Sequence, residues 1–87
     1  MQDVFIVDAV RTAVGTYGGS LRDVAPTTLG AIVAREAVSR SHVTPNAIDH
    51  VVFGQVVQTE PRDIYLARVV GMEAGLLQDV PALTVNR

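Results

Sequence analysis

The residues with the most chemical capacity lie together in one polar segment, Gln58–Asp63, which holds Glu60, Arg62 and Asp63. The segment follows an apolar run that is typical of a buried strand. In α/β proteins ligands tend to bind at the carboxyl ends of strands, which makes a functional role one interpretation of this segment. The other interpretation is a capped loop in which Arg62 or Asp63 joins a surface ion pair worth about 0–1 kcal/mol.

A further charged residue, Arg68, needs an explanation of its own. It follows Ile64 by one helical turn, on or beside a face built of small residues. A guanidinium group in such a place is costly to bury unless it is paired. We therefore expect a structural partner for Arg68, within the chain or across an interface. Arg62, Asp63 and Arg68 are candidates for structural ion pairs.

A glycine-rich segment, Gly15–Gly19, follows the first apolar run, in the position of a phosphate-binding loop. A P-loop needs a Lys, and the chain contains none. A dinucleotide-binding fingerprint needs G-x-G-x-x-G opening directly into a helix, whereas several residues separate Gly19 from the next helix start. The pattern disfavours an independent nucleotide-binding domain and favours a structural turn.

The other residue types that carry catalysis or bind metals form no complete set. The chain has no Cys, so it contains no thiolate nucleophile, disulfide or thiolate metal site. His42 and His50 flank a short turn near Asp49, but a metal needs three or four convergent ligands, so surface histidines are the better interpretation. None of the serines stands in a G-x-S-x-G turn. These patterns supply no catalytic residue and no metal site.

Hydrophobic periodicity and turn residues divide the chain into alternating strands and helices. The predicted elements are a strand at Val4–Val10, a helix from Pro26 capped by Thr27 or Thr28, a short helical turn from Pro45, a strand at Val51–Val57, a helix at Asp63–Ala74 ended by Gly75, and a strand at Pro81–Asn86. The order β-α-β-α-β implies parallel strands with crossover helices, and hence the α/β class.

Length and charge narrow the classes of protein further. At 87 residues the chain can form one small domain, and its 48% of apolar residues are too many for a disordered tail. Seven cations, all Arg, against nine Asp and Glu give a net charge of −2, so binding to nucleic acid or to an anionic membrane has no electrostatic basis. Because a signal-like start and a long apolar run are both missing, we expect a soluble cytoplasmic protein.

Five segments taken together resemble the start of the thiolase family. They occur in order across the chain: Val7–Thr12, Gly15–Leu21, Leu29–Ala31, Val52–Val56 and Pro81–Arg87. The segment Gln58–Arg68 is most similar to bacterial β-ketothiolases that feed polyhydroxyalkanoate synthesis. The resemblance implies that residues 1–87 are the first part of the thiolase N-terminal domain. It also implies a three-layer α/β/α fold with a mixed five-stranded sheet, to which this chain contributes β-α-β-α-β.

The resemblance implies a reaction as well. Thiolases condense two acyl-CoA molecules to a 3-ketoacyl-CoA, or run the reverse cleavage, through a thioester on a Cys nucleophile. A second Cys acts as acid and base, and His residues and waters stabilise the thioester oxygen. Coenzyme A thioesters are the substrates, and no cofactor is implied.

In the family, the nucleophile follows almost directly after an Asn-Arg pair like Asn86 and Arg87, beyond the last residue of this chain. No catalytic residue of the family therefore falls within residues 1–87. The strand that would present the nucleophile, and its end, are Leu83, Thr84, Val85, Asn86 and Arg87. The implied partners are the remainder of the thiolase chain and further copies of it, in a homodimer or tetramer with Ala82–Arg87 near the twofold interface.

Two expectations about the isolated chain follow from the resemblance. The chain is expected to be inactive, since the catalytic residues of the family lie elsewhere. It is also expected not to fold alone, because the family places later strands between the first strand and the other two. The alternative is a non-catalytic thiolase fragment that acts as an interaction or structural module.

Overall fold

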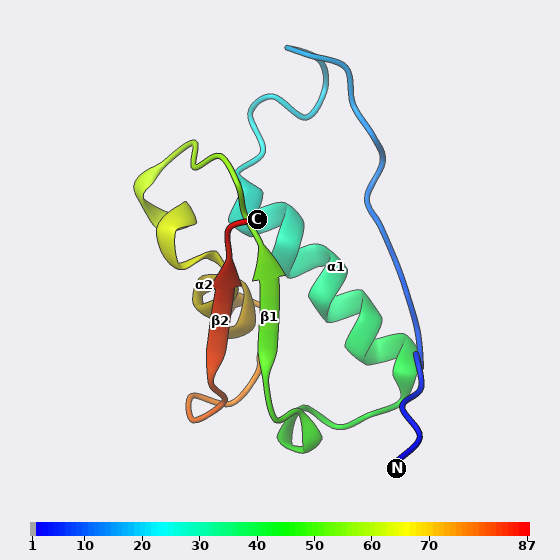
Figure 1. Ribbon diagram of the computed structural model, residues 1–87. Helices are drawn as coiled ribbons and strands as arrows, with labels where there is room; N and C mark the ends of the chain where they lie inside the picture. The colour runs from blue at the N-terminus through cyan, green and yellow to red at the C-terminus, as the bar shows by residue number, and fades with distance from the viewer. Residues whose placement is uncertain (1) are drawn as a thin grey trace.

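The computed structural model describes residues 2–87, whose course is shown in Figure 1. Its regular elements are α1 (Pro26–Ser41), η1 (Pro45–Ala47), β1 (Val51–Gly54), η2 (Pro61–Tyr65), α2 (Leu66–Glu73) and β2 (Ala82–Val85), where η denotes a 3₁₀ turn. The elements alternate between helix and strand, which confirms the α/β class. The molecule is elongated, with principal extents of 43 × 26 × 23 Å.

The two strands form a parallel sheet, as the alternation predicts. The register pairs Val51 with Ala82 and continues to Gly54 opposite Val85. Both strands are shorter than the apolar runs that predict them, because a ladder extends only as far as both strands supply partners. The chain passes from β1 to β2 through η2 and α2, so α2 is the crossover helix.

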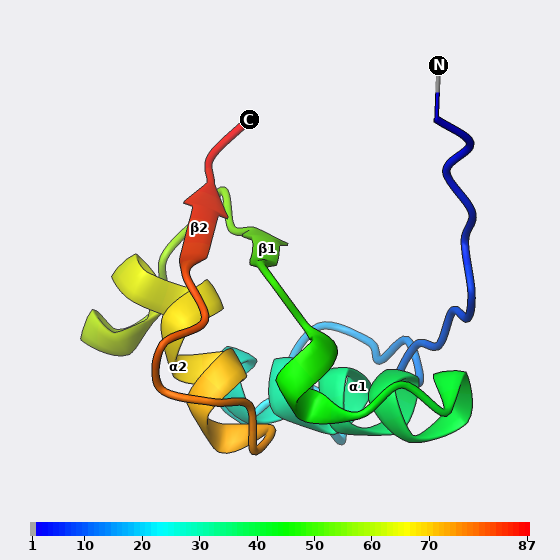
Figure 2. The same cartoon turned by 90° about the horizontal axis from the view of Figure 1, so that it is seen from below.

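Both helices lie on the same side of the sheet, which Figure 2 shows from below. The core lies between α2 and the strands and consists of Val51, Ala67 and Val80, with Phe53 and Leu76 among the partly buried residues around it. Ala67 has no exposed surface. Small residues on this face let α2 approach the sheet closely.

The start of α1 differs from the prediction in its capping residue. The helix begins after Ala25 with Pro26 in its first turn, and neither Thr27 nor Thr28 caps it. Ala25 occupies the capping position and both threonines lie inside the helix, so the predicted threonine cap is wrong. At the other end His42 adopts a left-handed conformation, with φ of 59°. His42 therefore ends the helix where a glycine is the usual residue.

The predicted second helix exists but begins differently. Residues Pro61–Tyr65 form a 3₁₀ turn, and the α-helix proper starts at Leu66. The helix stops at Glu73, and Gly75 follows with φ of 90°, a backbone conformation that residues with a side chain rarely adopt. The predicted glycine stop is thus confirmed.

The predicted strand at Val4–Val10 is wrong for this structure. These residues follow an extended course in Figure 1 but form no ladder with any of residues 2–87. Phe5 and Ile6 are 78% and 90% exposed. Figure 2 shows this segment apart from β1, with α1 below both and no other strand of residues 2–87 between them, so neither strand of the sheet pairs with it. An apolar run also needs a hydrogen-bonding neighbour to become a strand, and the described part of the chain offers none. Residues 2–87 therefore form a sheet of two strands, where the resemblance implies that this chain contributes three strands to a sheet of five.

Candidate functional site

The carboxyl ends of β1 and β2 lie side by side, and the chain around them is held together by hydrogen bonds. The Gln55 N–H donates to the Val85 carbonyl at 2.9 Å. The Asn86 side chain donates through Nδ2 to the Val56 carbonyl at 3.1 Å. In Figure 1 both arrowheads point to this end, where the chain terminus also lies. The loop after β1 and the end of β2 therefore form one unit.

Asp63 organises this loop from within. Its side chain has no exposed surface, and its Oδ2 accepts hydrogen bonds from the N–H and the hydroxyl of Thr59, both at 2.7 Å. The N–H of Glu60 donates to the same oxygen at 3.3 Å, and Gln55 Nε2 lies 3.5 Å from it. The hydroxyl and N–H of Thr59 hold the pKa of the Asp63 carboxyl below its ordinary value, against the effect of burial.

Asp63 therefore has a different role from the ion pair that was one of its interpretations. No cation lies within ion-pair distance of its carboxylate among residues 2–87. Backbone and hydroxyl donors replace the cation, in a reciprocal capping arrangement with Glu60 at the start of η2. The second oxygen, Oδ1, is buried and accepts no hydrogen bond from the described residues.

Arg62 does form an ion pair, with Glu73 at the end of α2. The Glu73 carbonyl also accepts a hydrogen bond of 2.6 Å from Arg35 of α1. Two arginines from different elements thus converge on the last residue of α2. Cations are favoured at this position because the carboxyl end of a helix carries a partial negative charge.

Arg68 has the expected partner within the chain, but the partner is not an acid. Its guanidinium donates to the carbonyls of Val80 and Gln78, at 3.0 and 2.8 Å. No carboxylate lies within ion-pair distance of it in the described part of the chain. The prediction that Arg68 forms an ion pair is therefore wrong. Its guanidinium instead fixes the loop that leads into β2.

Thr84 connects β2 to the crossover helix. Its hydroxyl oxygen accepts a hydrogen bond of 3.0 Å from the N–H of Ala67, in the first turn of α2. Side chains alternate along β2, so Leu83 and Val85 face the other way and are 52% and 36% exposed. Asn86 and Arg87 are exposed as well. The predicted scaffold residues thus present one face to α2 and one face outward.

The sequence places Thr84 among the scaffold residues and Thr59 within the segment Gln58–Asp63, but it does not predict their hydrogen bonds, and it assigns no role to Gln55. The pairing of Thr59 with Asp63 had a local signal, because a polar residue shortly before Pro61 and an acid two residues after it are typical of a helix start. The contacts of Gln55 and Thr84 have no such local signal in the sequence. Their contacts join segments whose proximity depends on the pairing of β1 with β2.

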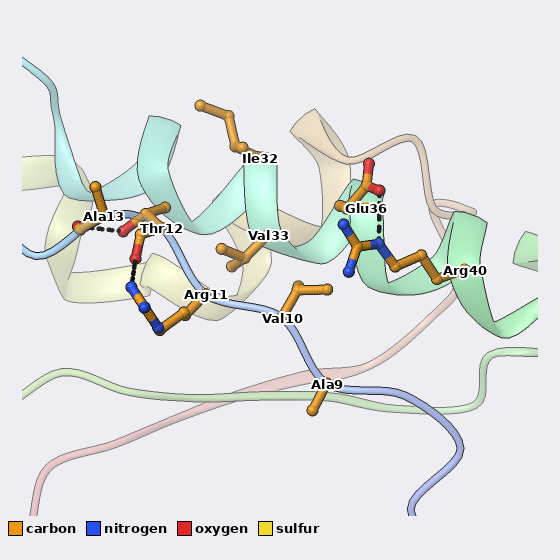
Figure 3. A pocket seen from close by; sticks show the side chains of 9 residues that line it. All are labelled: Ala9, Val10, Arg11, Thr12, Ala13, Ile32, Val33, Glu36 and Arg40. Carbon is orange, nitrogen blue, oxygen red and sulfur yellow. Dashed lines mark hydrogen bonds and ion pairs between the residues drawn. The ribbon is translucent and has the colours of Figure 1, made fainter.

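Two hollows elsewhere on the molecule contain no comparable chemistry. Figure 3 shows the first, between residues 9–13 and α1, where Glu36 pairs with Arg40 at 2.8 Å and Arg11 donates to the Thr12 carbonyl. Both arginines are thus engaged locally. The second is largely apolar and lies between the first segment and β1, lined by Val10, Ala37 and Phe53 among others.

Among residues 2–87, no three His, Cys, Asp or Glu side chains gather closely enough to hold a metal ion. The same residues include no helix of the length and apolarity that a bilayer crossing requires.

Known proteins match this chain along nearly its whole length. The model of the thiolase N-terminal domain family matches residues 4–87. Beta-ketothiolase BktB of Cupriavidus necator is 57% identical over 86 residues, which are 99% of this chain and 22% of the relative. The mitochondrial 3-ketoacyl-CoA thiolase of Bos taurus is 46% identical over 87 residues, again 22% of its length. The chain thus spans about a fifth of the length of these relatives.

Solved structures show the same relationship in three dimensions. The human mitochondrial 3-ketoacyl-CoA thiolase superposes on 94% of this chain with a TM-score of 0.90, at 44% identity and over 21% of its own length. The acetyl-CoA acetyltransferase of Bacillus anthracis superposes with a TM-score of 0.87 at 36% identity. With its family match, its relatives and its fold in agreement, the chain belongs to the thiolase family and covers the N-terminal portion of its members.

Proposed function

We propose that this chain is part of an acyl-CoA C-acyltransferase that condenses acyl-CoA molecules, or cleaves a 3-ketoacyl-CoA, through a Cys thioester. The main support is the identity of 57% to beta-ketothiolase BktB over nearly the whole chain. The similarity of Gln58–Arg68 to bacterial β-ketothiolases that feed polyhydroxyalkanoate synthesis also supports a role in supplying 3-ketoacyl-CoA for that pathway. Coenzyme A thioesters are the substrates in this proposal, and no further cofactor takes part.

Within such an enzyme the chain supplies scaffold and no reacting group. Leu83–Arg87 would lead the polypeptide to the nucleophilic Cys, which in this proposal comes from residues that follow Arg87. The bonds from Gln55 to Val85 and from Asn86 to Val56 hold this exit in place. The isolated chain is then inactive, because its sequence contains no Cys to form the thioester.

The proposal also includes assembly with further copies of the enzyme. β2 pairs with β1 along one edge, and its other edge has no partner among residues 2–87. An unpaired strand edge with outward apolar residues such as Leu83 is suited to pairing with a second copy. A homodimer, or a tetramer built from two dimers, is the expected assembly.

A hybrid enzyme tests the function. Residues 1–87 replace the matching 86 residues of BktB, which gives a full-length protein called here the BktB hybrid. We expect the hybrid to cleave acetoacetyl-CoA with a kcat within about tenfold of that of BktB, whereas residues 1–87 alone show no turnover. A hybrid that folds and assembles normally but lacks turnover would contradict the proposal, as would turnover by residues 1–87 alone.

A further inference from the structure

We propose that Asp63 is a positioning residue for the thiolase reaction. It fixes the loop after β1, and this loop holds the end of β2 and Asn86, the residue that follows β2. The inference rests on the proposed function and concerns the same site. Asp63 itself touches no reacting atom in this proposal. It acts through the loop 55–60.

Asp63 holds the loop through its hydrogen bonds to Thr59. A residue that only caps η2 needs to accept a hydrogen bond from Glu60, the capping position. The two shortest contacts of Asp63 instead go one residue further back, to the N–H and the hydroxyl of Thr59, at 2.7 Å each. Its carboxylate is also fully buried. Asp63 therefore holds the loop in addition to capping the turn.

The loop 55–60 in turn contacts β2 and the residue that follows it. The loop reaches the last residue of β2 through Gln55, whose N–H donates to Val85. It reaches the next residue through Val56, whose carbonyl accepts a hydrogen bond from the Asn86 side chain. Both contacts lie within a few residues of Thr59 in the chain. A loop released at Thr59 would therefore loosen the end of β2.

Covalent catalysis is sensitive to the position of the reacting group. In the proposed function, the reacting Cys follows shortly after Asn86 and Arg87. A displacement of about 1 Å at a reacting group can cost about a hundredfold in rate. In this proposal Asp63 and the loop 55–60 do not contact the substrate. Loss of the hydrogen bonds between Thr59 and Asp63 should therefore lower kcat and leave KM unchanged.

The experiment removes one hydroxyl from the BktB hybrid. Thr59→Val keeps the size of the side chain and deletes one of the two short bonds to Asp63. We expect kcat for acetoacetyl-CoA cleavage, counted per titratable active-site thiol, to fall about tenfold at unchanged KM. Alkylation of the nucleophilic Cys by iodoacetamide should slow by a similar factor. Thr59→Ser restores the hydroxyl and should restore both rates.

Thr44→Val is the matched control. Thr44 also donates a short hydroxyl bond, of 2.6 Å to Asn46, but beside η1, before the start of β1. This variant should leave kcat and alkylation unchanged. If the unsubstituted hybrid is active and Thr59→Val behaves like Thr44→Val, the positioning role of Asp63 is wrong and the proposed function stands. The positioning role is also wrong if Thr59→Ser is as slow as Thr59→Val. An inactive unsubstituted hybrid overturns the proposed function, and this inference with it.

Discussion

At the scale of single residues, the charged side chains of this chain differ in the chemical type of the group that they contact. Arg62 meets a carboxylate, Arg68 meets carbonyls, and Asp63 meets N–H and hydroxyl groups. Residue type alone marks all three as charged and costly to bury. It does not say whether a countercharge or a set of dipoles offsets the cost, because that depends on which backbone groups the fold leaves free nearby.

Asp63 should make the stability of the hybrid depend on pH in the acid range. The carboxyl has an ordinary pKa of 3.8, and the Thr59 donors lower this value in the folded state. A lowered folded pKa favours folding above pH 3.8, and this contribution is lost as the pH falls through the folded value. The Asp63→Asn variant lacks the contribution at every pH.

Thermal denaturation of the hybrid and of Asp63→Asn measures this difference. The gap in apparent Tm should be largest at about pH 6 and should narrow steadily below about pH 4. Asp79→Asn is a matched control, since Asp79 is exposed on the loop before β2. A gap of constant size across this range would show that the charge of Asp63 does not contribute.

At the scale of elements, the sequence predicts helices better than strands in this chain. The helix starting at Pro26 and the stop at Gly75 depend on residues close in sequence, and both are present. The strand predicted at Val4–Val10 depends on partners distant in sequence, and it is missing. The same difference holds for the contacts of the site. The capping of η2 by Asp63 depends on residues close in sequence, so the sequence can predict it. The contact of Thr84 with Ala67 depends on where β2 lies, so the sequence alone does not predict it.

The crossing of α1 and α2 depends on one glycine. Gly30 is buried in α1, and a Cβ built on it would lie 2.6 Å from Cγ2 of Val70, a fully buried residue of α2. Val70 has one strongly preferred rotamer in a helix, so it cannot easily move aside. Gly71 of α2 is also buried, but a Cβ there would meet Val51 at 3.4 Å, close to ordinary contact.

The two glycines should therefore respond differently to substitution by alanine. Each change gains up to about 1 kcal/mol of helix propensity. In Gly30→Ala the overlap with Val70 outweighs this gain, and we expect the hybrid to lose about 1–3 kcal/mol and several degrees of apparent Tm. Gly71→Ala should keep or raise the Tm. Adding Val70→Ala to Gly30→Ala should cost less than Val70→Ala costs alone. A Tm for Gly30→Ala at or above that of the unsubstituted hybrid would refute the close packing of the helices.

At the scale of the whole molecule, the chain exposes more surface than a self-contained domain of its mass. A folded monomer of 9.3 kDa is expected to expose about 5,000 Å², whereas this chain exposes 6627 Å². Its radius of gyration is 13.7 Å, against about 12 Å for a compact domain of this length. The excess is apolar in part, since Val4 is 92% exposed and Phe5 78%. The exposed apolar side chains therefore need further structure to cover them from water.

Residues 1–87 should accordingly fail to fold as an independent unit. A two-stranded sheet is marginal in water, and here only Val51, Ala67 and Val80 form the buried cluster beneath it. The apolar run from Val4 to Val7 adds nothing to that cluster, and its backbone has no ladder in the described structure. Circular dichroism of the purified chain should show a gradual loss of helical signal on heating, without a sigmoidal transition, while the BktB hybrid melts cooperatively. Cooperative melting of the isolated chain, with sedimentation as a monomer, would mean that the two helices and two strands suffice, and that the exposed apolar segment is tolerated without a cover.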